Sequence, residues 1–141
     1  PDKFEAGTQN IIGIAGLHHS LKWLDTFGIQ NIHTKEQKLL KLFLDGIKGL
    51  PIKIAGGDSA ENRVGIVSID FSEFMDNAEA GAALEEKYGI LTRCGLHCSP
   101  SAHKSIGTFP QGTVRFSTGP FTIEEEIETA IRAVKELCSK D

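Results

Sequence analysis

Apolar residues recur at three- and four-residue steps along four parts of the chain, and this spacing predicts amphipathic helices. The first helix is expected over residues 10–27, with Gly28 as its C-terminal stop signal. A second is expected from Thr34 to about Lys48, because Thr34 and Gln37 have the spacing of a capping box. Two helices therefore open the chain.

Two more helices are expected farther along. Asp76 is a suitable N-cap for the third, which ends at Tyr88 ahead of Gly89. Thr122 and Glu125 have capping-box spacing before the fourth. The apolar face of this last helix comprises Ile127, Ala130, Ile131, Val134, Leu137 and Cys138, and it predicts that the Cys138 thiol is buried.

Four short segments rich in β-branched residues lie between the helices and predict strands. They are residues 52–55, 64–71, 90–94 and 113–117. Strands follow one another as well as helices, without strict alternation of the two. This order favours an α+β fold, a two-layer sandwich in which helices pack on one face of a small, mostly antiparallel sheet.

Composition narrows the class of protein. Apolar residues make up 40% of the 141 residues and charged residues 24%, enough for a core and a polar surface. Fifteen basic and 19 acidic residues are interleaved, with a net charge of -4, so there is no basic stripe for nucleic acid. No apolar run approaches the roughly 20 residues of a membrane span. Three cysteines, an odd number, favour free thiols in the reducing cytoplasm.

Residues 95–112 differ from the rest of the chain. Glycine, proline, histidine and cysteine are concentrated there, and the stretch is expected to be too irregular for a helix or a strand. A loop of this length in a small domain is more often functional than accidental.

Two interpretations of this loop use its cysteines together. Cys94, His97, Cys98 and His103 are residue types that bind zinc, although their spacing is not that of a zinc knuckle and no second ligand pair occurs elsewhere. Cys94 and Cys98 could also form a redox pair, although their spacing is not Cys-x-x-Cys. Both stay as alternatives, and no bound metal is expected.

A third interpretation makes Cys98 a nucleophile. His97 and Arg93 give its surroundings a positive character that favours the reactive thiolate. A buried or bystander cysteine is the plainer alternative. A fourth interpretation concerns Lys104, because Ser-x-His-Lys is the setting in which one group of pyridoxal-phosphate enzymes holds its Schiff-base lysine.

Two further features suit the binding of anions. In the predicted strand 113–117, Val114 and Phe116 share one face, so Arg115 lies on the other, as a solvated charge or as a clamp for a carboxylate. Gly7 and Thr8 precede the first helix, where small polar residues can cap the helix or bind a phosphate.

Several motifs in order resemble one family. The chain is similar to the C-terminal part of cysteine desulfurases and their class V aminotransferase relatives, which are fold type I pyridoxal-phosphate enzymes. The resemblance spans essentially the whole chain. It is carried by E-A-G-T-x-N (5–10), R-x-G-L-H-C-S-P (93–100), A-H-K-x-I-G-T (102–108), G-T-V-R-F-S (112–117) and E-E-E-I (124–127).

The resemblance implies a function for individual residues. Such enzymes are homodimers that use pyridoxal 5'-phosphate to take sulfur from L-cysteine as an enzyme persulfide, leaving alanine. Cys98 would be the persulfide-forming nucleophile, with His97 as a possible activator. Arg115 would bind the substrate carboxylate, and Arg93 would be a second anion contact. Gly7 and Thr8 would reach the cofactor phosphate of the neighbouring subunit.

The family's Schiff-base lysine lies upstream, in a large domain that is absent from this chain. Lys104 instead matches the A-H-K segment that follows the catalytic cysteine. The chain is therefore expected to be a fragment, with a linking segment over residues 1–28 and a small domain over residues 29–141, inactive alone. A class V aminotransferase, a selenocysteine lyase and a non-catalytic thiol or zinc-binding module are the alternatives. The sulfur acceptor protein is unidentified.

Overall fold

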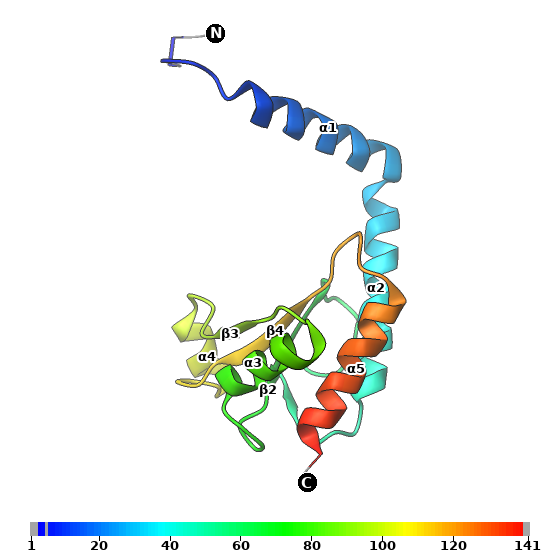
Figure 1. Cartoon of the computed structure of the whole chain (residues 1–141), viewed down its shortest axis with the longest axis vertical. Helices are drawn as coiled ribbons and strands as arrows, with labels where there is room; N and C mark the ends of the chain where they lie inside the picture. The colour runs from blue at the N-terminus through cyan, green and yellow to red at the C-terminus, as the bar shows by residue number, and fades with distance from the viewer. Residues whose placement is uncertain (1–2, 5, 140–141) are drawn as a thin grey trace. The chain divides into compact units, whose positions relative to one another are not determined.

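The computed structural model describes residues 3–4 and 6–139. It divides the chain into two compact units, residues 1–33 and 34–141 (Figure 1). The elements follow in the order α1, α2, β1, β2, α3, β3, α4, β4 and α5. No helix among the described residues is both long enough and apolar enough to cross a membrane.

Helix α1 (Ile11–Phe27) forms where the apolar spacing predicted it. Asn10 caps the helix, because its Oδ1 accepts a hydrogen bond of 3.0 Å from the backbone N–H of Gly13. Gly28, at φ +89°, ends it by donating to the carbonyl of Leu24. No residue of α1 is buried, and its exposed apolar side chains are Ile11, Ile12, Ile14, Leu17, Leu21 and Phe27.

Helix α2 (Ile29–Ile47) begins earlier than the sequence predicted. The carbonyl of Gly28 accepts a backbone hydrogen bond of 3.1 Å from Asn31, so a new helix starts directly behind the break. Thr34 therefore lies inside the helix, and the capping box predicted for Thr34 and Gln37 is wrong. The expected division at residues 28 and 29 remains a prediction.

The four strands form one sheet in the order β1-β2-β4-β3, and every neighbouring pair is antiparallel, as predicted. Strand β3 begins only at Arg93, because Gly89 and Ile90 are used to close the C-terminal end of helix α3 (Asn77–Tyr88). Gly89 adopts φ +67°, and the N–H of Ile90 donates to the carbonyl of Leu84 at 3.0 Å. The strand bounds are Lys53–Ile54 (β1), Ile66–Asp70 (β2), Arg93–Gly95 (β3) and Thr113–Ser117 (β4).

Helix α5 (Glu124–Cys138) also begins one residue away from its predicted start. The N–H of Ile123 donates to the carboxylate of Glu126 at 3.0 Å. The hydroxyl of Thr122 is used in the preceding turn, where it accepts a hydrogen bond of 3.0 Å from Gly119. The last helix is confirmed, but Thr122 is not its cap.

Helix α4 (Pro100–Ile106) lies within the stretch that the sequence analysis expected to be irregular, and that expectation is wrong. Pro100 occupies the first turn, where the missing N–H breaks no helical hydrogen bond. Gly107, at φ +73°, ends the helix by donating to the carbonyl of His103. The glycine and proline that suggested a loop are therefore the two ends of a short helix.

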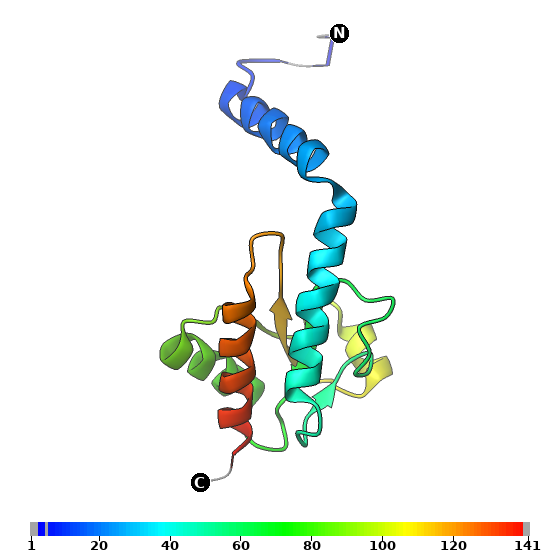
Figure 2. The same ribbon diagram turned by 90° about the vertical axis from the view of Figure 1, so that its right-hand side faces the viewer.

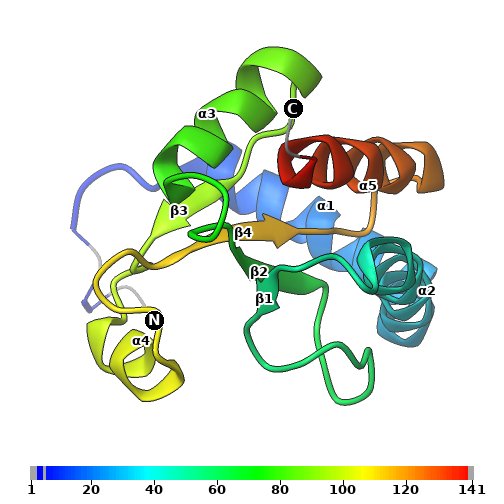
Figure 3. The same cartoon turned by 90° about the horizontal axis from the view of Figure 1, so that it is seen from below.

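The helices α2, α3 (Asn77–Tyr88) and α5 lie on one side of the sheet, and α4 lies away from them (Figure 3). Figure 2 shows α2 and α5 side by side, and they touch at Gly46 and Ile131. The ring of Phe43 packs 5.2 Å from that of Phe116 on β4. The predicted α+β sandwich is confirmed. Its core comprises Leu39, Leu40, Phe43, Leu44, Ile47, Val67, Ile69, Phe71, Ala80, Leu84, Val114, Phe116, Ile127, Ala130, Ala133, Val134 and Leu137.

Two features hold the ends of β2, β3 and β4 together: the hydrogen bonds of Asn77 and the close contact of Gly112 with Gly95. Asn77 is buried at the start of α3, and its Oδ1 accepts a hydrogen bond of 2.8 Å from the N–H of Phe71. Its Nδ2 donates to Asp70 at 3.0 Å and to the carbonyl of Gly112 at 3.1 Å. Gly112 has φ +74°, and a Cβ there would collide with the backbone of Gly95. Only glycine at position 112 allows the backbone before β4 to approach the end of β3 this closely.

Candidate active site

Strand β4 presents different side chains on its two faces. Val114 and Phe116 are buried in the core, and the alternation places Arg115 on the opposite face, as the sequence predicted. Thr113 shares that face, is 1% exposed, and its Oγ1 has no hydrogen-bond partner in the structure. Buried hydroxyls are normally paired, so this face of β4 suits a polar ligand that would complete the pairing.

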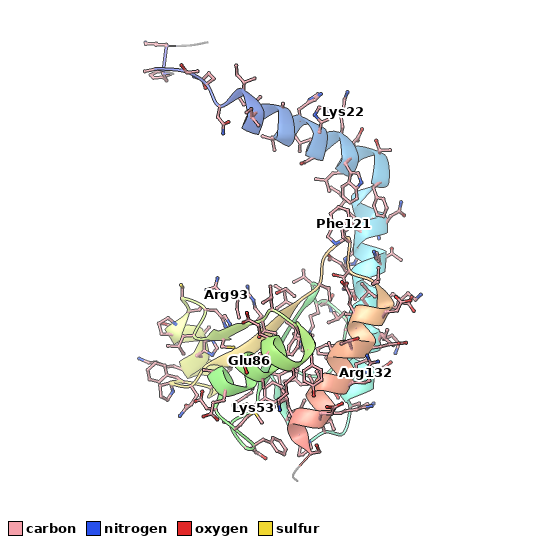
Figure 4. The ribbon with its side chains drawn as sticks, viewed as in Figure 1. Lys22, Lys53, Glu86, Arg93, Phe121 and Arg132 are labelled. Atoms are coloured by element: carbon pink, nitrogen blue, oxygen red, sulfur yellow. The ribbon has the colours of Figure 1, made fainter. Side chains whose placement is uncertain are left out.

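Arg93 of β3 lies directly opposite Arg115 of β4 in the strand register. Opposite residues of antiparallel strands share a face with their Cβ atoms roughly 5 Å apart, where two like charges are destabilising. Within the part of the chain that the structure describes, neither guanidinium forms an ion pair, and the Arg115 Nε is buried without a partner. Figure 4 shows the Arg93 side chain at the β3 side of the sheet. The pair suits an anion, above all a carboxylate that accepts two parallel hydrogen bonds.

Cys98 lies in the turn that directly follows β3. The N–H of Ser99 donates to the carbonyl of Leu96 at 2.8 Å, which closes a four-residue turn. The two central residues, His97 and Cys98, have φ values of +51° and +58°. The Cys98 thiol is free and exposed. The turn therefore presents a thiol to solvent three residues beyond the end of the strand that carries Arg93.

His97 connects this turn to the strand before it. Its Nε2 lies 3.0 Å from the carbonyl oxygen of Arg93, and because that oxygen can only accept, Nε2 carries the proton. The imidazole of His97 also lies 5.8 Å from the ring of His103 on α4. His103 is buried, and its Nδ1 is hydrogen-bonded at 2.7 Å to the Oγ1 of Thr108.

Sequence reasoning did not single out Thr113 or Thr108. Thr113 precedes Arg115 by two residues, so the strand alternation that placed Arg115 also places Thr113 on its face and could have identified it. No local signal marks Thr108, because its partner His103 belongs to a helix that the sequence did not predict.

The other two cysteines have different surroundings. Cys94 is exposed on β3 and its Sγ lies against Gly81 of α3. Cys138 is packed against the core on α5 but is only half-buried, so its predicted burial is partial, and this burial raises the pKa of the Cys138 thiol. Among the described residues, no three His, Cys, Asp or Glu side chains come together as a metal site would require.

The remaining predicted residues belong to α4 and to the N-terminal unit. Lys104 is exposed on α4, with its Nζ 4.9 Å from the centre of the Phe109 ring. Gly7 and Thr8 belong to the N-terminal unit and are exposed. Gly7 has φ +86°, with open space where a Cβ would be. Glu5, the first residue of the E-A-G-T-x-N motif, lies outside the described residues.

An exposed turn carries a thiol, and the adjoining strands carry two guanidinium groups without ion-pair partners among the described residues. Enzymes use such groups as a nucleophile and as a binding site for an anionic substrate. The sequence matches the aminotransferase class-V family over residues 1–129, and the chain belongs to this family of enzymes. The chain is 34% identical over 137 residues to a probable cysteine desulfurase of Pyrococcus abyssi. It is 33% identical over 135 residues to a cysteine desulfurase of Wigglesworthia glossinidia brevipalpis. These alignments cover 97% and 95% of this chain, but 33% and 31% of the relatives.

Solved structures agree with these relatives. The apo cysteine desulfurase of Thermococcus onnurineus NA1 is similar with a TM-score of 0.86 and 31% identity, over 98% of this chain and 34% of that one. The cysteine desulfurase CsdA of Escherichia coli, in its S-sulfonic acid form, is similar with a TM-score of 0.80 and 25% identity, over 97% and 33%. The resemblance inferred from the motifs is confirmed, and the chain spans about a third of the length of these proteins.

Proposed function

We propose that this chain is part of a cysteine desulfurase that takes sulfur from L-cysteine as a persulfide on Cys98 and releases alanine. One observation carries the proposal. An exposed thiol follows the strand whose Arg93 faces Arg115, and neither arginine has an anionic partner among the described residues. A reactive thiol and a carboxylate-binding pair are the two groups that such a reaction needs from this part of the enzyme.

Arg115 holds the carboxylate of the amino acid in this proposal. Its Nε is buried without a hydrogen-bond partner among the described residues, so a bound carboxylate would satisfy this donor. Arg93 lies opposite and adds a second positive charge. Thr113, buried on the same face, could donate its hydroxyl proton to the same group.

The class-V family implies pyridoxal 5'-phosphate as the cofactor. Gly7 and Thr8 fit the binding of its phosphate, because both are exposed and the space around the Gly7 Cα is open. When bound, the cofactor supplies an electron sink that weakens bonds to the amino acid. Lys104 is exposed on α4 with its Nζ over the Phe109 ring, and the relatives are about three times as long as this chain, which together support a Schiff-base lysine elsewhere in the full-length protein.

The Cys98 thiolate carries out the sulfur transfer in this proposal. Its Sγ attacks the sulfur atom of the bound cysteine, so that a sulfur–sulfur bond forms and the substrate carbon–sulfur bond breaks. The electron pair of the broken bond stays with the substrate carbon, which takes up a proton on the way to alanine. Cys98 then holds one extra sulfur atom, and its exposed position supports delivery to an acceptor protein.

We infer that the full-length protein works in the cytoplasm as a homodimer. Cys94, Cys98 and Cys138 are all free thiols in the structure, which supports a reducing compartment. The apolar residues along α1 are exposed in this chain. In a protein about three times as long, they would be covered by the rest of the same subunit or by a second subunit.

The test compares Cys98→Ser with Cys94→Ser in the full-length protein, because both thiols are exposed and four residues apart. With L-cysteine, Cys98→Ser should lose both the mass increase of one sulfur atom, measured without reductant, and the sulfide release, measured after a reductant is added, whereas Cys94→Ser should keep both. Sulfide release by Cys98→Ser at the parental rate would contradict the proposal. Activity of Cys98→Ser on selenocysteine alone would indicate a selenocysteine lyase, and amino transfer without sulfide would indicate an aminotransferase.

A further inference from the structure

The backbone of the Cys98 turn has a conformation that its residues do not favour. A tight turn with positive φ at both central positions is normally built from glycine, asparagine or aspartate. Here the two positions are His97, at φ +51°, and Cys98, at φ +58°. Side chains with a Cβ are disfavoured there, so the surrounding structure must hold the turn in place.

One side-chain hydrogen bond ties this turn back to the strand before it. The Nε2–H of His97 donates to the carbonyl of Arg93 at 3.0 Å, spanning four residues. This bond joins the residue beside the nucleophile to the backbone of the residue that faces Arg115. A single imidazole therefore links the position of the Cys98 thiol to the position of the guanidinium pair.

The ring of His97 is itself supported from α4. It lies 5.8 Å from the ring of His103, at an interplanar angle of 35°. His103 is 6% exposed and is hydrogen-bonded to Thr108, which is 3% exposed. A buried, hydrogen-bonded side chain has few alternative rotamers, so it gives the His97 ring a fixed surface.

We propose that His97 is a positioning residue, which holds the Cys98 thiol in register with the carboxylate-binding strand and does not exchange a proton with it. This inference rests on the proposed function. The Nε2–H is engaged by the carbonyl of Arg93, and among the described residues the His97 ring makes no hydrogen bond to the Cys98 thiol.

Three replacements of His97 separate positioning from activation. His97→Gln places an amide N–H about where Nε2 lies, so it can still donate to Arg93, but it cannot titrate. His97→Asn tolerates positive φ well but is too short to reach that carbonyl. His97→Ala removes the side chain and keeps only the strained backbone.

The test measures kcat and KM for L-cysteine in the full-length protein, with the rate of persulfide formation as a function of pH. Positioning predicts that His97→Ala and His97→Asn lower kcat about 10- to 100-fold with KM within about twofold, while His97→Gln recovers most of it. The pH at which the rate is half-maximal should be the same in all four proteins.

The inference is overturned by any of three results. His97→Gln as slow as His97→Ala, with a shifted pH profile, would show that the imidazole activates the thiol. His97→Asn as fast as His97→Gln would show that the turn conformation suffices without the tie. His97→Ala at the parental rate would show that neither matters. Cys98→Ser, measured alongside, reports on the proposed function itself, because its loss of activity stands whatever His97 does.

Discussion

Replacing Arg115 with methionine should stabilise the isolated 141-residue chain while abolishing the binding of cysteine in the full-length protein. Methionine keeps an unbranched stem on β4 but removes the guanidinium. A buried donor without a partner, as the Nε of Arg115 is, costs about 1–3 kcal/mol. The opposed charge of Arg93 adds roughly 0.2–1 kcal/mol. Some packing is lost in exchange, so we expect the free energy of unfolding to rise by about 1–3 kcal/mol.

Urea denaturation followed by circular dichroism measures this change, with Arg132→Met as the matched control. Arg132 is exposed on α5 and donates to Thr129 at 2.9 Å, so its replacement should change the free energy of unfolding by less than about 0.5 kcal/mol. Added salt should narrow the gap between the parent and Arg115→Met, because it screens the charge repulsion. An Arg115→Met chain that unfolds more easily than the parent would refute the reasoning, since the guanidinium would then stabilise the fold.

Three further outcomes are expected from the isolated chain. Asn77→Ala should lower the free energy of unfolding by about 3 kcal/mol, because it leaves buried groups unpaired, against about 1 kcal/mol for the exposed cap removed by Asp76→Ala; equal urea midpoints would contradict this. Alkylation at pH 8 should modify Cys98 at least about tenfold faster than Cys138, whose raised pKa requires a higher pH for the thiolate; mass spectrometry of the digested chain decides the order. Pyridoxal phosphate followed by borohydride should give no dominant adduct on Lys104, and a single stoichiometric adduct there would argue against a Schiff-base lysine outside this chain.

Local patterns predicted the elements of this fold better than their ends. The alternation in strand 113–117 placed Val114 and Phe116 in the core and Arg115 on the other face, because a strand repeats every two residues. The start of α2 was missed because Gly28 ends one helix and its carbonyl immediately begins the next. Gly28 has no side chain that could cap α2, so a search for capping residues passes over this start and stops at Thr34.

The site could be predicted residue by residue but not as an arrangement. Motifs singled out Cys98, Arg93 and Arg115, whereas the pairing of the two arginines depends on the register between strands about 20 residues apart. Helix α4 was missed because proline and glycine indicate a turn when read without their positions in a helix. The tie from His97 to Arg93 requires positive φ in the turn, which no residue there signals.

The contact between Gly81 and Cys94 couples the amino-acid substitutions that these two positions can accept. A glycine inside α3 weakens the helix by about 1 kcal/mol relative to alanine, so replacement by alanine would be favourable in an open position. The Cys94 sulfur occupies the space that the new methyl group needs, but the Cys94 Cβ lies a comfortable 3.8 Å away. Gly81→Ala therefore requires that the Cys94 side chain rotate away from α3 or that Cys94 lose its sulfur, so a change at one of these positions alters what the other can accept.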